Sequence, residues 1–188
     1  MNAYFFIYNK SKFTVVAVAF TLLLLGGERA CGQTASATTT INIVLADVIT
    51  IDSGSAAADG AVAFNYASAE DYNTLKTNTV PNSLIVTSTK NFDIKVKAEG
   101  ASFTDGTNHI PVEVLSIRAV KGGDMGGTKN DVTLSLENQV LVRNAPLGSK
   151  LSLDLDYEIP ALEASSNKIL GKPAGSYTQK VTYTATAL

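Results

Sequence analysis

The chain has few of the residues that carry catalytic or metal-binding chemistry, since its 188 residues include one cysteine, one histidine and no tryptophan. A tetrahedral zinc site needs several histidine or cysteine ligands, which this composition cannot supply. The only histidine, His109, stands just before Pro111, and no serine or carboxylate pattern of a catalytic triad surrounds it. We therefore predict a protein that is not an enzyme, with no catalytic residue, no metal site and no cofactor, in which His109 is an exposed loop residue.

Long hydrophobic runs are equally scarce, and the sequence holds one, from Phe13 to Leu25. Lys10 and Lys12 precede this run and two glycines follow it, an order typical of a secretory signal peptide. The run is shorter than the roughly 20 apolar residues that a helix needs to cross a bilayer. We therefore expect an exported protein, located at the cell surface, in the periplasm or outside the cell, with no transmembrane segment once the signal is removed.

Small side chains at Ala30 and Gly32 place the expected cleavage site after Gly32, which makes residues 1–32 the signal peptide and Gln33 the new N-terminus. Lipidation of Cys31 is the alternative, although charged residues precede it where a lipidation motif has an aliphatic side chain. Cleavage after Gly32 would remove the only cysteine, so the mature protein would have no disulfide. Its stability would then come from packing alone.

Positive charge is also in short supply once the signal is gone. The whole chain has 15 basic and 17 acidic residues, and three of the basic and one of the acidic residues lie in the signal peptide. The remaining 12 basic and 16 acidic residues give residues 33–188 a net charge of −4. Such a surface repels a phosphate backbone, so nucleic acid is excluded as a partner.

The number of residues in 33–188 suits a single domain with one hydrophobic core, so one domain is predicted over this range.

What the sequence has in abundance is alternation of apolar and polar residues with a period of two. From Phe92 to Glu99 every even residue is apolar and every odd residue is charged, the pattern of a strand with one face in water. From Leu151 to Ile159 the odd residues are apolar, and Pro160 ends the segment. Residues 132–137 and 180–187 alternate in the same way. These four segments predict strands.

Less regular strands are predicted at 83–87, 110–120 and 140–143, with a bulge near the centre of 110–120. A first strand is predicted to end at Ile51. The connecting segments are rich in glycine, asparagine, aspartate and serine, which favour turns. About seven or eight short strands joined in this way predict an all-β fold, an antiparallel β-sandwich.

The segment around Ser68 is the one exception to the strand pattern. Ser68 can cap a helix and Asp71 stands three residues later, so a single short helical turn is predicted within 68–76. Tyr66 and Tyr72 are the aromatic residues that lie clearly outside the predicted strands. Sugars bind on aromatic faces, so these two tyrosines are candidates for a glycan site; the alternative is a structural role.

Two further patterns resemble ligand sites only in part. Asp154, Asp156 and Glu158 share one face of a predicted strand, but alternate residues stand roughly 6.5–7 Å apart, too far for neighbouring carboxylates to hold one calcium ion. We expect a solvated acidic face. The glycines from Gly122 to Gly127 lack the Gly-Lys-Ser/Thr ending of a phosphate-binding loop, so we expect a hairpin connection there.

Three segments together carry a resemblance to a known family. Pro173 to Thr178 (PAGSYT) with the alternating residues after it resembles the closing strand of the spore coat protein U and archaic chaperone-usher pilin family. Thr38 to Ile51 (TTTINIVLADVITI) is similar to the first segment of those subunits, and Ser83 to Gly100 to their central strand pair. The resemblance implies an incomplete immunoglobulin-like sandwich, completed by the N-terminal segment of a neighbouring subunit added as a strand.

This chain has a segment suited to that role. Thr39, Ile41, Ile43 and Leu45 share one face of an extended chain, and they are the predicted subunit-contact residues. One interpretation is a donor segment, Thr38 to Leu45, followed by the domain's own strand at 48–51. The other is a single strand, bent near Asp47, that pairs with its own sheet.

The function predicted from these observations is that of a structural surface subunit, pilin-like or coat-like, with a role in adhesion or biofilm. Its partners would be copies of itself or related subunits, and the resemblance adds a periplasmic chaperone and an outer-membrane usher. The alternative is a monomeric secreted sandwich that binds cell-wall or host glycan through its loops and tyrosines.

Overall fold

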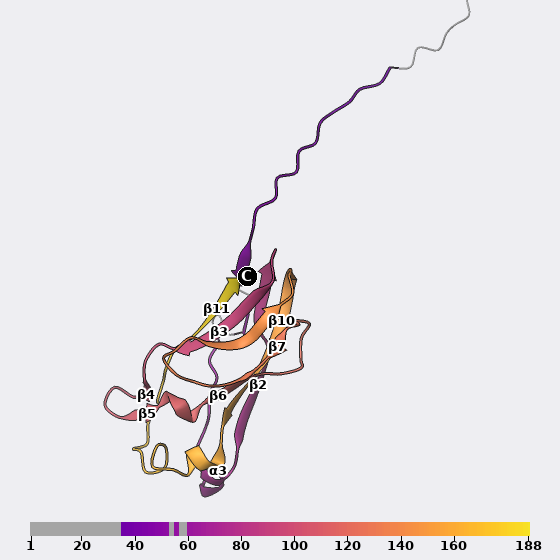
Figure 1. The fold of residues 1–188 in the computed structure, drawn as a ribbon. Coiled ribbons are helices and arrows are strands. Elements are labelled where there is room, and N and C mark those ends of the chain that lie inside the picture. The colour runs from indigo at the N-terminus through magenta and orange to yellow at the C-terminus, as the bar shows by residue number, and fades with distance from the viewer. Residues whose placement is uncertain (1–34, 53–54, 57–59) are drawn as a thin grey trace, which may run out of the picture. The chain divides into compact units, whose positions relative to one another are not determined.

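The computed structural model describes residues 35–52, 55–56 and 60–188, and these form an all-β protein, as the alternation predicted. The chain divides into two units, Met1–Val44 and Leu45–Leu188. All the strands described below lie in the second unit (Figure 1). The predicted signal peptide, with Cys31 and the cleavage site, lies outside the described residues.

The first sheet has the strand order β1-β2-β10-β6-β8, and each neighbouring pair is antiparallel. Its longest pairing joins β2 to β10, which runs from Lys76↔Ile159 to Ser88↔Gly148 with two register shifts. The strand bounds are β1 (Ile49–Ile51), β2 (Lys76–Ser88), β6 (Ser116–Ala119), β8 (Asp131–Thr133) and β10 (Gly148–Ile159).

The second sheet has the order β11-β3-β9-β7, again antiparallel. A separate hairpin of β4 (Ser102–Thr104) and β5 (His109–Pro111) follows β3, and a bridge from Thr104 to Thr178 ties it to the segment before β11. The bounds in the second sheet are β3 (Phe92–Ala98), β7 (Thr128–Lys129), β9 (Gln139–Ala145) and β11 (Val181–Ala187).

Both sheets contribute to one hydrophobic core, which makes the fold a sandwich. Alternate residues of β3 and β10 point into it, as their period-two pattern predicted, and the largest side chains that are almost wholly buried come from both layers. These are Phe92, Leu84, Ile94, Ile117, Leu134, Leu141, Leu153 and Leu155.

The strand order resembles that of an immunoglobulin-like sandwich, with β8 extending the first sheet beyond β6 and β9 and β7 extending the second beyond β3. In such a sandwich one sheet has the order A-B-E-D and the other contains C, F and G. Here β1, β2, β10 and β6 occupy the A, B, E and D places, while β3 and β11 occupy C and F. The remaining place, that of strand G beside β11, is empty among the described residues.

A serine side chain takes the place of strand pairing where β1 stops. The hydroxyl of Ser55 accepts a hydrogen bond from Ile85 N (2.8 Å) and donates to Ile85 O (3.4 Å). Ser55 is 4% exposed, so its hydroxyl serves backbone groups of β2 that water does not reach from that side. Past this point Asn78 of β2 donates its side-chain N–H to Ala63 O (2.7 Å), which holds the chain along β2.

The helical prediction is confirmed by α3 (Ala69–Asn73), which has Ser68 as its N-cap and Asp71 at the third position of a capping box. A second short helix, α4 (Ala161–Ala164), follows β10. The single bulged strand predicted over 110–120 is wrong, because a 3-10 turn at Val112–Val114, where Leu115 N bonds to Val112 O (3.1 Å), separates β5 from β6, which lie in different sheets.

Two strand predictions extended too far. The alternating segment 132–137 is a strand only as far as Thr133, and Leu136 is 53% exposed although the pattern placed it inside. The cause is a turn in which the Ser135 hydroxyl accepts a hydrogen bond from Glu137 N (3.2 Å). In the predicted first strand, only Ile49–Ile51 is a strand, and no residue from Ala35 to Val48 lies in one.

Replacing Ser55 by alanine should lower the free energy of unfolding by about 1–3 kcal/mol, because Ile85 N would lose the partner of a buried hydrogen bond. Urea denaturation measures this. Ser165→Ala is the matched control, since its hydroxyl bonds to Ala161 O on an exposed helix and the change should stay within about 0.5 kcal/mol. Equal effects of the two substitutions would contradict the role given to Ser55.

Candidate functional site: the open edge of the second sheet

The outer side of β11 carries an unpaired row of backbone groups. β11 is the last strand of its sheet, and no described strand pairs with its other side. Hydrogen bonds from Glu99 N to Lys180 O (3.0 Å) and from Leu188 N to Asn91 O (2.8 Å) show that even-numbered residues bond to β3. Because pairing alternates along an antiparallel strand, the odd-numbered residues direct their N–H and C=O groups outward. This row, called the open edge below, consists of Val181, Tyr183, Ala185 and Ala187.

The side chains along the open edge are only partly covered. Val181, Tyr183 and Ala185 pack against the core but remain partly exposed. Their direct partners on β3, Val96 and Ile94 among them, are fully buried. Because paired residues of one sheet face the same layer, the difference comes from the absence of a neighbour on the far side of β11. The open edge therefore combines free backbone groups with partly exposed apolar side chains.

β1 of the other sheet lies beside β11, so the two strands border the open edge together. Thr89 N bonds to Val48 O (2.9 Å) and Asp52 N bonds to Ile85 O (2.8 Å), which places the even-numbered residues of this strand toward β2. By the same alternation, Ile49 and Ile51 direct their backbone groups away from β2. Their side chains are partly buried against the core.

A partly buried pair of tyrosine hydroxyls holds β11 in place. The hydroxyl oxygens of Tyr183 on β11 and Tyr157 on β10 are 2.7 Å apart, and Ser83 of β2 lies 3.4 Å from Tyr157. The chain of hydroxyls links an edge strand of the second sheet to two strands of the first. Burial, and then the neighbouring Tyr157, raises the pKa of Tyr183 well above its ordinary value. The neutral hydroxyl is therefore the form that the fold favours.

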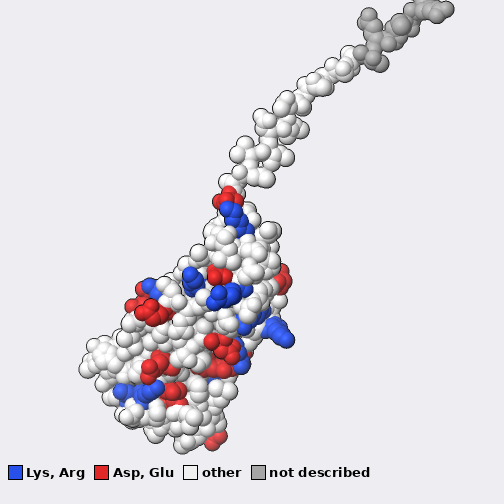
Figure 2. Space-filling view, viewed as in Figure 1, with Lys and Arg blue, Asp and Glu red and all other residues white. Residues whose placement is uncertain are grey.

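The segment Thr38 to Leu45, called the donor segment below after the role that the sequence predicts for it, presents its apolar side chains to solvent. Ile41 and Ile43 are each 81% exposed and Leu45 is 88% exposed, and no residue of the segment lies in a helix or strand. The segment also contains no charged residue and is uniformly white in Figure 2, whereas charges of both signs are interspersed on the domain. Uncharged chain with exposed isoleucine and leucine is unusual for a surface that stays in water.

The three carboxylates of β10 bond to their neighbours. Arg118 bonds to Asp156 (3.1 Å) and to Glu158 (2.6 Å), while Thr79 donates to Asp156 (2.6 Å). The solvated face predicted for Asp156 is wrong, because it is 8% exposed beneath these partners. Asp154 accepts a hydrogen bond from the backbone N–H of Asn82 (2.7 Å). Across the described part of the chain, no cluster of three metal-ligating side chains could hold an ion.

The glycine-rich connection packs against the domain. Met125 is buried, and Asp124 accepts hydrogen bonds from the N–H (2.6 Å) and hydroxyl (2.9 Å) of Ser152. Gly123 has a φ of +69°, and a Cβ there would lie 2.4 Å from Ser152 O, so the close approach requires glycine.

His109 is exposed, as predicted, but it is the first residue of β5 and not part of a loop.

Tyr66 and Tyr72 lie together, with ring centroids 5.0 Å apart and planes inclined by 41°. Both are partly buried against the core, and the Lys76 ammonium lies 5.9 Å from the centre of the Tyr66 ring. The Tyr66 hydroxyl is buried, and no described residue bonds to it. Burial, followed by Tyr72 and Asp71, raises its pKa to about 12. The pair therefore forms a tilted, partly covered cluster, whereas a sugar needs a flat exposed platform.

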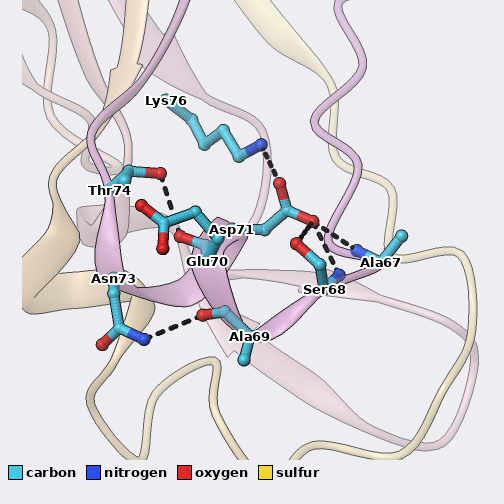
Figure 3. A network of polar contacts seen from close by, with 8 residues as sticks. All are labelled: Ala67, Ser68, Ala69, Glu70, Asp71, Asn73, Thr74 and Lys76. Carbon is cyan, nitrogen blue, oxygen red and sulfur yellow. Dashed lines mark hydrogen bonds and ion pairs between the residues drawn. The ribbon is translucent and has the colours of Figure 1, made fainter.

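Asp71 organises the residues next to this pair (Figure 3). It forms an ion pair with Lys76 and accepts hydrogen bonds from the backbone N–H groups of Ala67 (2.9 Å) and Ser68 (2.7 Å). The bond from Lys76, and then those from Ala67 and Ser68, hold the pKa of Asp71 well below its usual range. These contacts are those of a capped helix start, so a structural role accounts for them.

Comparison with models of known protein families, with curated proteins and with solved structures found no match to this chain. Within the described residues, no helix is long and apolar enough to cross a membrane.

The sequence analysis singled out the residues of the donor segment, but it did not identify the open edge or Tyr183. The available signal was the alternation of residues 180–187, which places threonines on one face of that predicted strand.

Tyr183→Phe should change how stability depends on alkaline pH. Because the folded state raises the pKa of Tyr183, its contribution is complete below the unfolded pKa of about 10 and is lost as the pH rises beyond that value. The phenylalanine variant cannot ionise there, so it should lose less stability above pH ~10. At neutral pH it should be about 1 kcal/mol less stable because the hydroxyl bond is gone. Urea unfolding across the pH range, with Tyr72→Phe as control, checks this; identical alkaline losses in parent and Tyr183→Phe would refute it.

Proposed function

We propose that this protein is a structural surface subunit, pilin-like or coat-like, that assembles with like subunits by adding the donor segment of one chain to the open edge of the next. The single observation that carries the proposal is the unpaired edge of β11 beside β1, in a sandwich whose strand order leaves one place empty. An edge with free backbone groups is a template for strand addition.

The donor segment is complementary to this edge in chemistry. The edge offers outward N–H and C=O groups at four residues, and an extended segment can bond to each of them. Ile41, Ile43 and Leu45 share one face, and inserting the segment would turn that face toward the partly covered core. The absence of charge in the segment favours burial, because a buried unpaired charge is strongly unfavourable.

The energies are of the size that assembly requires. Burial of an isoleucine or leucine side chain contributes roughly 1.5–3 kcal/mol, so three of them would contribute roughly 4.5–9 kcal/mol. Each backbone hydrogen bond adds about 0.5–1.5 kcal/mol. Association itself costs an estimated 4–15 kcal/mol, which means that side chains and backbone pairing must act together. A tight subunit contact therefore needs the whole segment to pair.

The proposed location follows from the predicted signal peptide. Export would place the subunit at the cell surface, in the periplasm or outside the cell, where a filament or coat could serve adhesion or a biofilm. The resemblance to the spore coat protein U and archaic chaperone-usher pilin family adds a periplasmic chaperone and an outer-membrane usher as expected partners. A free open edge and an exposed apolar segment would both need protection before assembly.

A monomeric glycan-binding module is the second candidate, and Tyr66 and Tyr72 would be its site. The close pairing of the two rings favours it. The two rings are partly buried and tilted, which makes them unsuited to a flat sugar-binding platform. The contacts between Asp71 and Lys76 explain the cluster without a ligand. The open edge is therefore the better supported site.

Deleting residues 33–45 should abolish self-association. The parent chain should form oligomers whose size grows with concentration, and the deletion variant should elute as a monomer, because it keeps an open edge but has no donor. Size-exclusion chromatography with light scattering measures both. A parent that is monomeric at every concentration, or a deletion variant that still forms the same oligomers, would contradict the proposal.

Ile43→Asp should prevent assembly while leaving the domain folded. The change places a carboxylate on the face that must become dry, at a cost of several kcal/mol on insertion. Asn42→Asp is a matched control, because it adds the same charge one residue away on the opposite face. Sedimentation velocity should show monomers for the first variant and oligomers for the second. Equal behaviour of the two variants would remove the donor assignment.

A further inference from the structure

A donor segment attached to the same chain as an open edge raises a problem of competition. A tether of a few residues gives an effective concentration on the order of millimolar, about a thousandfold above a micromolar solution of other copies. If a subunit could add its donor segment to its own open edge, self-insertion would therefore be favoured over assembly with other copies. If the proposed function holds, some feature of the chain must prevent self-insertion. The inference below rests on that proposed function.

Self-insertion would require the chain to reverse direction just before β1. β1 starts at the end of the domain where β11 finishes, because Val48 O bonds to Thr89 N and Leu188 N bonds to Asn91 O, both in the connection between β2 and β3. A chain entering β1 from this end and also lying along β11 has to make a hairpin with β1. The donor segment ends at Leu45 and β1 begins at Ile49, so only 46–48 could form the turn.

Two of these three residues, Asp47 and Val48, are held in a different arrangement. Val48 donates its N–H to the hydroxyl of Thr89 (2.9 Å), and its C=O accepts from Thr89 N (2.9 Å), so both of its backbone groups are directed toward β2. Asp47 pairs with Lys90 (2.5 Å), and the Ser88 hydroxyl donates to Lys90 O (2.6 Å), which holds the same turn. A turn that includes Val48 would break its two hydrogen bonds with Thr89.

The residue types at the junction also oppose a turn. Tight hairpins favour Asn-Gly, Asp-Gly or Gly-Gly at positions with positive φ, and Asp47 is followed by valine instead of glycine. Val48 is β-branched, which makes a positive φ especially unfavourable. Moving the turn earlier in the chain would use Ile43 and Leu45 as loop residues and leave the open edge without the side chains that suit it.

We propose that the junction of Asp47 and Val48, fastened to Thr89 and Lys90, prevents each subunit from filling its own open edge and reserves that edge for the donor segment of a second copy. The contact is then between two different surfaces, a segment and an edge. Such a heterologous contact propagates into open chains of subunits unless the rotation between neighbours closes it into a ring or two copies exchange segments reciprocally.

The test is to make self-insertion possible. A four-residue insert, Gly-Asn-Gly-Ser, is placed between Ala46 and Asp47 in the full chain, which leaves the Val48–Thr89 contacts intact and supplies a permissive turn. The matched control carries the same insert between Ala37 and Thr38, upstream of the donor segment. Circular dichroism establishes that both variants fold.

We expect the junction insert to give monomers at concentrations where the parent and the control insert form oligomers, a shift of roughly a thousandfold in the concentration needed for assembly. A labelled peptide of residues 38–45 should bind the variant lacking 33–45 but not the junction-insert variant, whose edge is already filled.

The possible failures are distinguishable. If the parent oligomerises through residues 33–45 and the junction insert does so equally, the junction does not prevent self-insertion, while the proposed function stands. A monomeric junction-insert variant that still binds the peptide as the deletion variant does would also overturn the inference. If the parent never oligomerises and the deletion changes nothing, the proposed function and this inference fall together.

Discussion

The constraint on which the account depends is that the outer backbone groups of an edge strand have no strand partner, and β11, like β1, β8 and β7, is an edge strand among the described residues. The backbone groups of Val181, Tyr183, Ala185 and Ala187 point to the side without a strand. The apolar side chains of the same strand are less well covered than those of β3 for the same reason. Backbone pairing and core burial are therefore incomplete at the same place, and one added strand would complete both.

The domain holds this incomplete edge in position with interactions on its inner side. β11 pairs with β3 along its whole length, and Leu188 N bonds to Asn91 O beyond its last residue. The Tyr183–Tyr157 hydroxyl pair ties it to the first sheet from within. An edge strand held in this way keeps its extended conformation in the absence of a partner strand. The proposed acceptor role requires such a preformed edge.

Much of the fold could be predicted from the sequence, because a strand with one face in water alternates apolar and polar residues. The alternation at Phe92 to Glu99 and at Leu151 to Ile159 located β3 and β10, and Ser68 with Asp71 located α3. Alternation cannot say where a partner strand ends, however. Leu136 fits the pattern and is exposed, because β8 has already ended and Ser135 turns the chain.

The candidate site was predictable only in part, for a related reason. The predicted subunit-contact residues Thr39, Ile41, Ile43 and Leu45 could be chosen from local alternation, but whether they pair depends on which strands lie next to one another. That order joins residues far apart in the chain, such as Ile49 with Ser88 and Val181 with Ala98. The burial of Asp156 and the role of Ser55 are likewise properties of the assembled sheets, since their partners Arg118 and Ile85 come from other segments.

Amide hydrogen exchange along β11 tests the central claim most directly. In the chain lacking residues 33–45, the amides of Thr182, Thr184 and Thr186 should be protected by β3, while those of Val181, Tyr183 and Ala185 should exchange quickly. Addition of a peptide of residues 38–45 should slow the second group and leave the first unchanged. Equal protection of both groups without the peptide, or no change when it is added, would contradict the account.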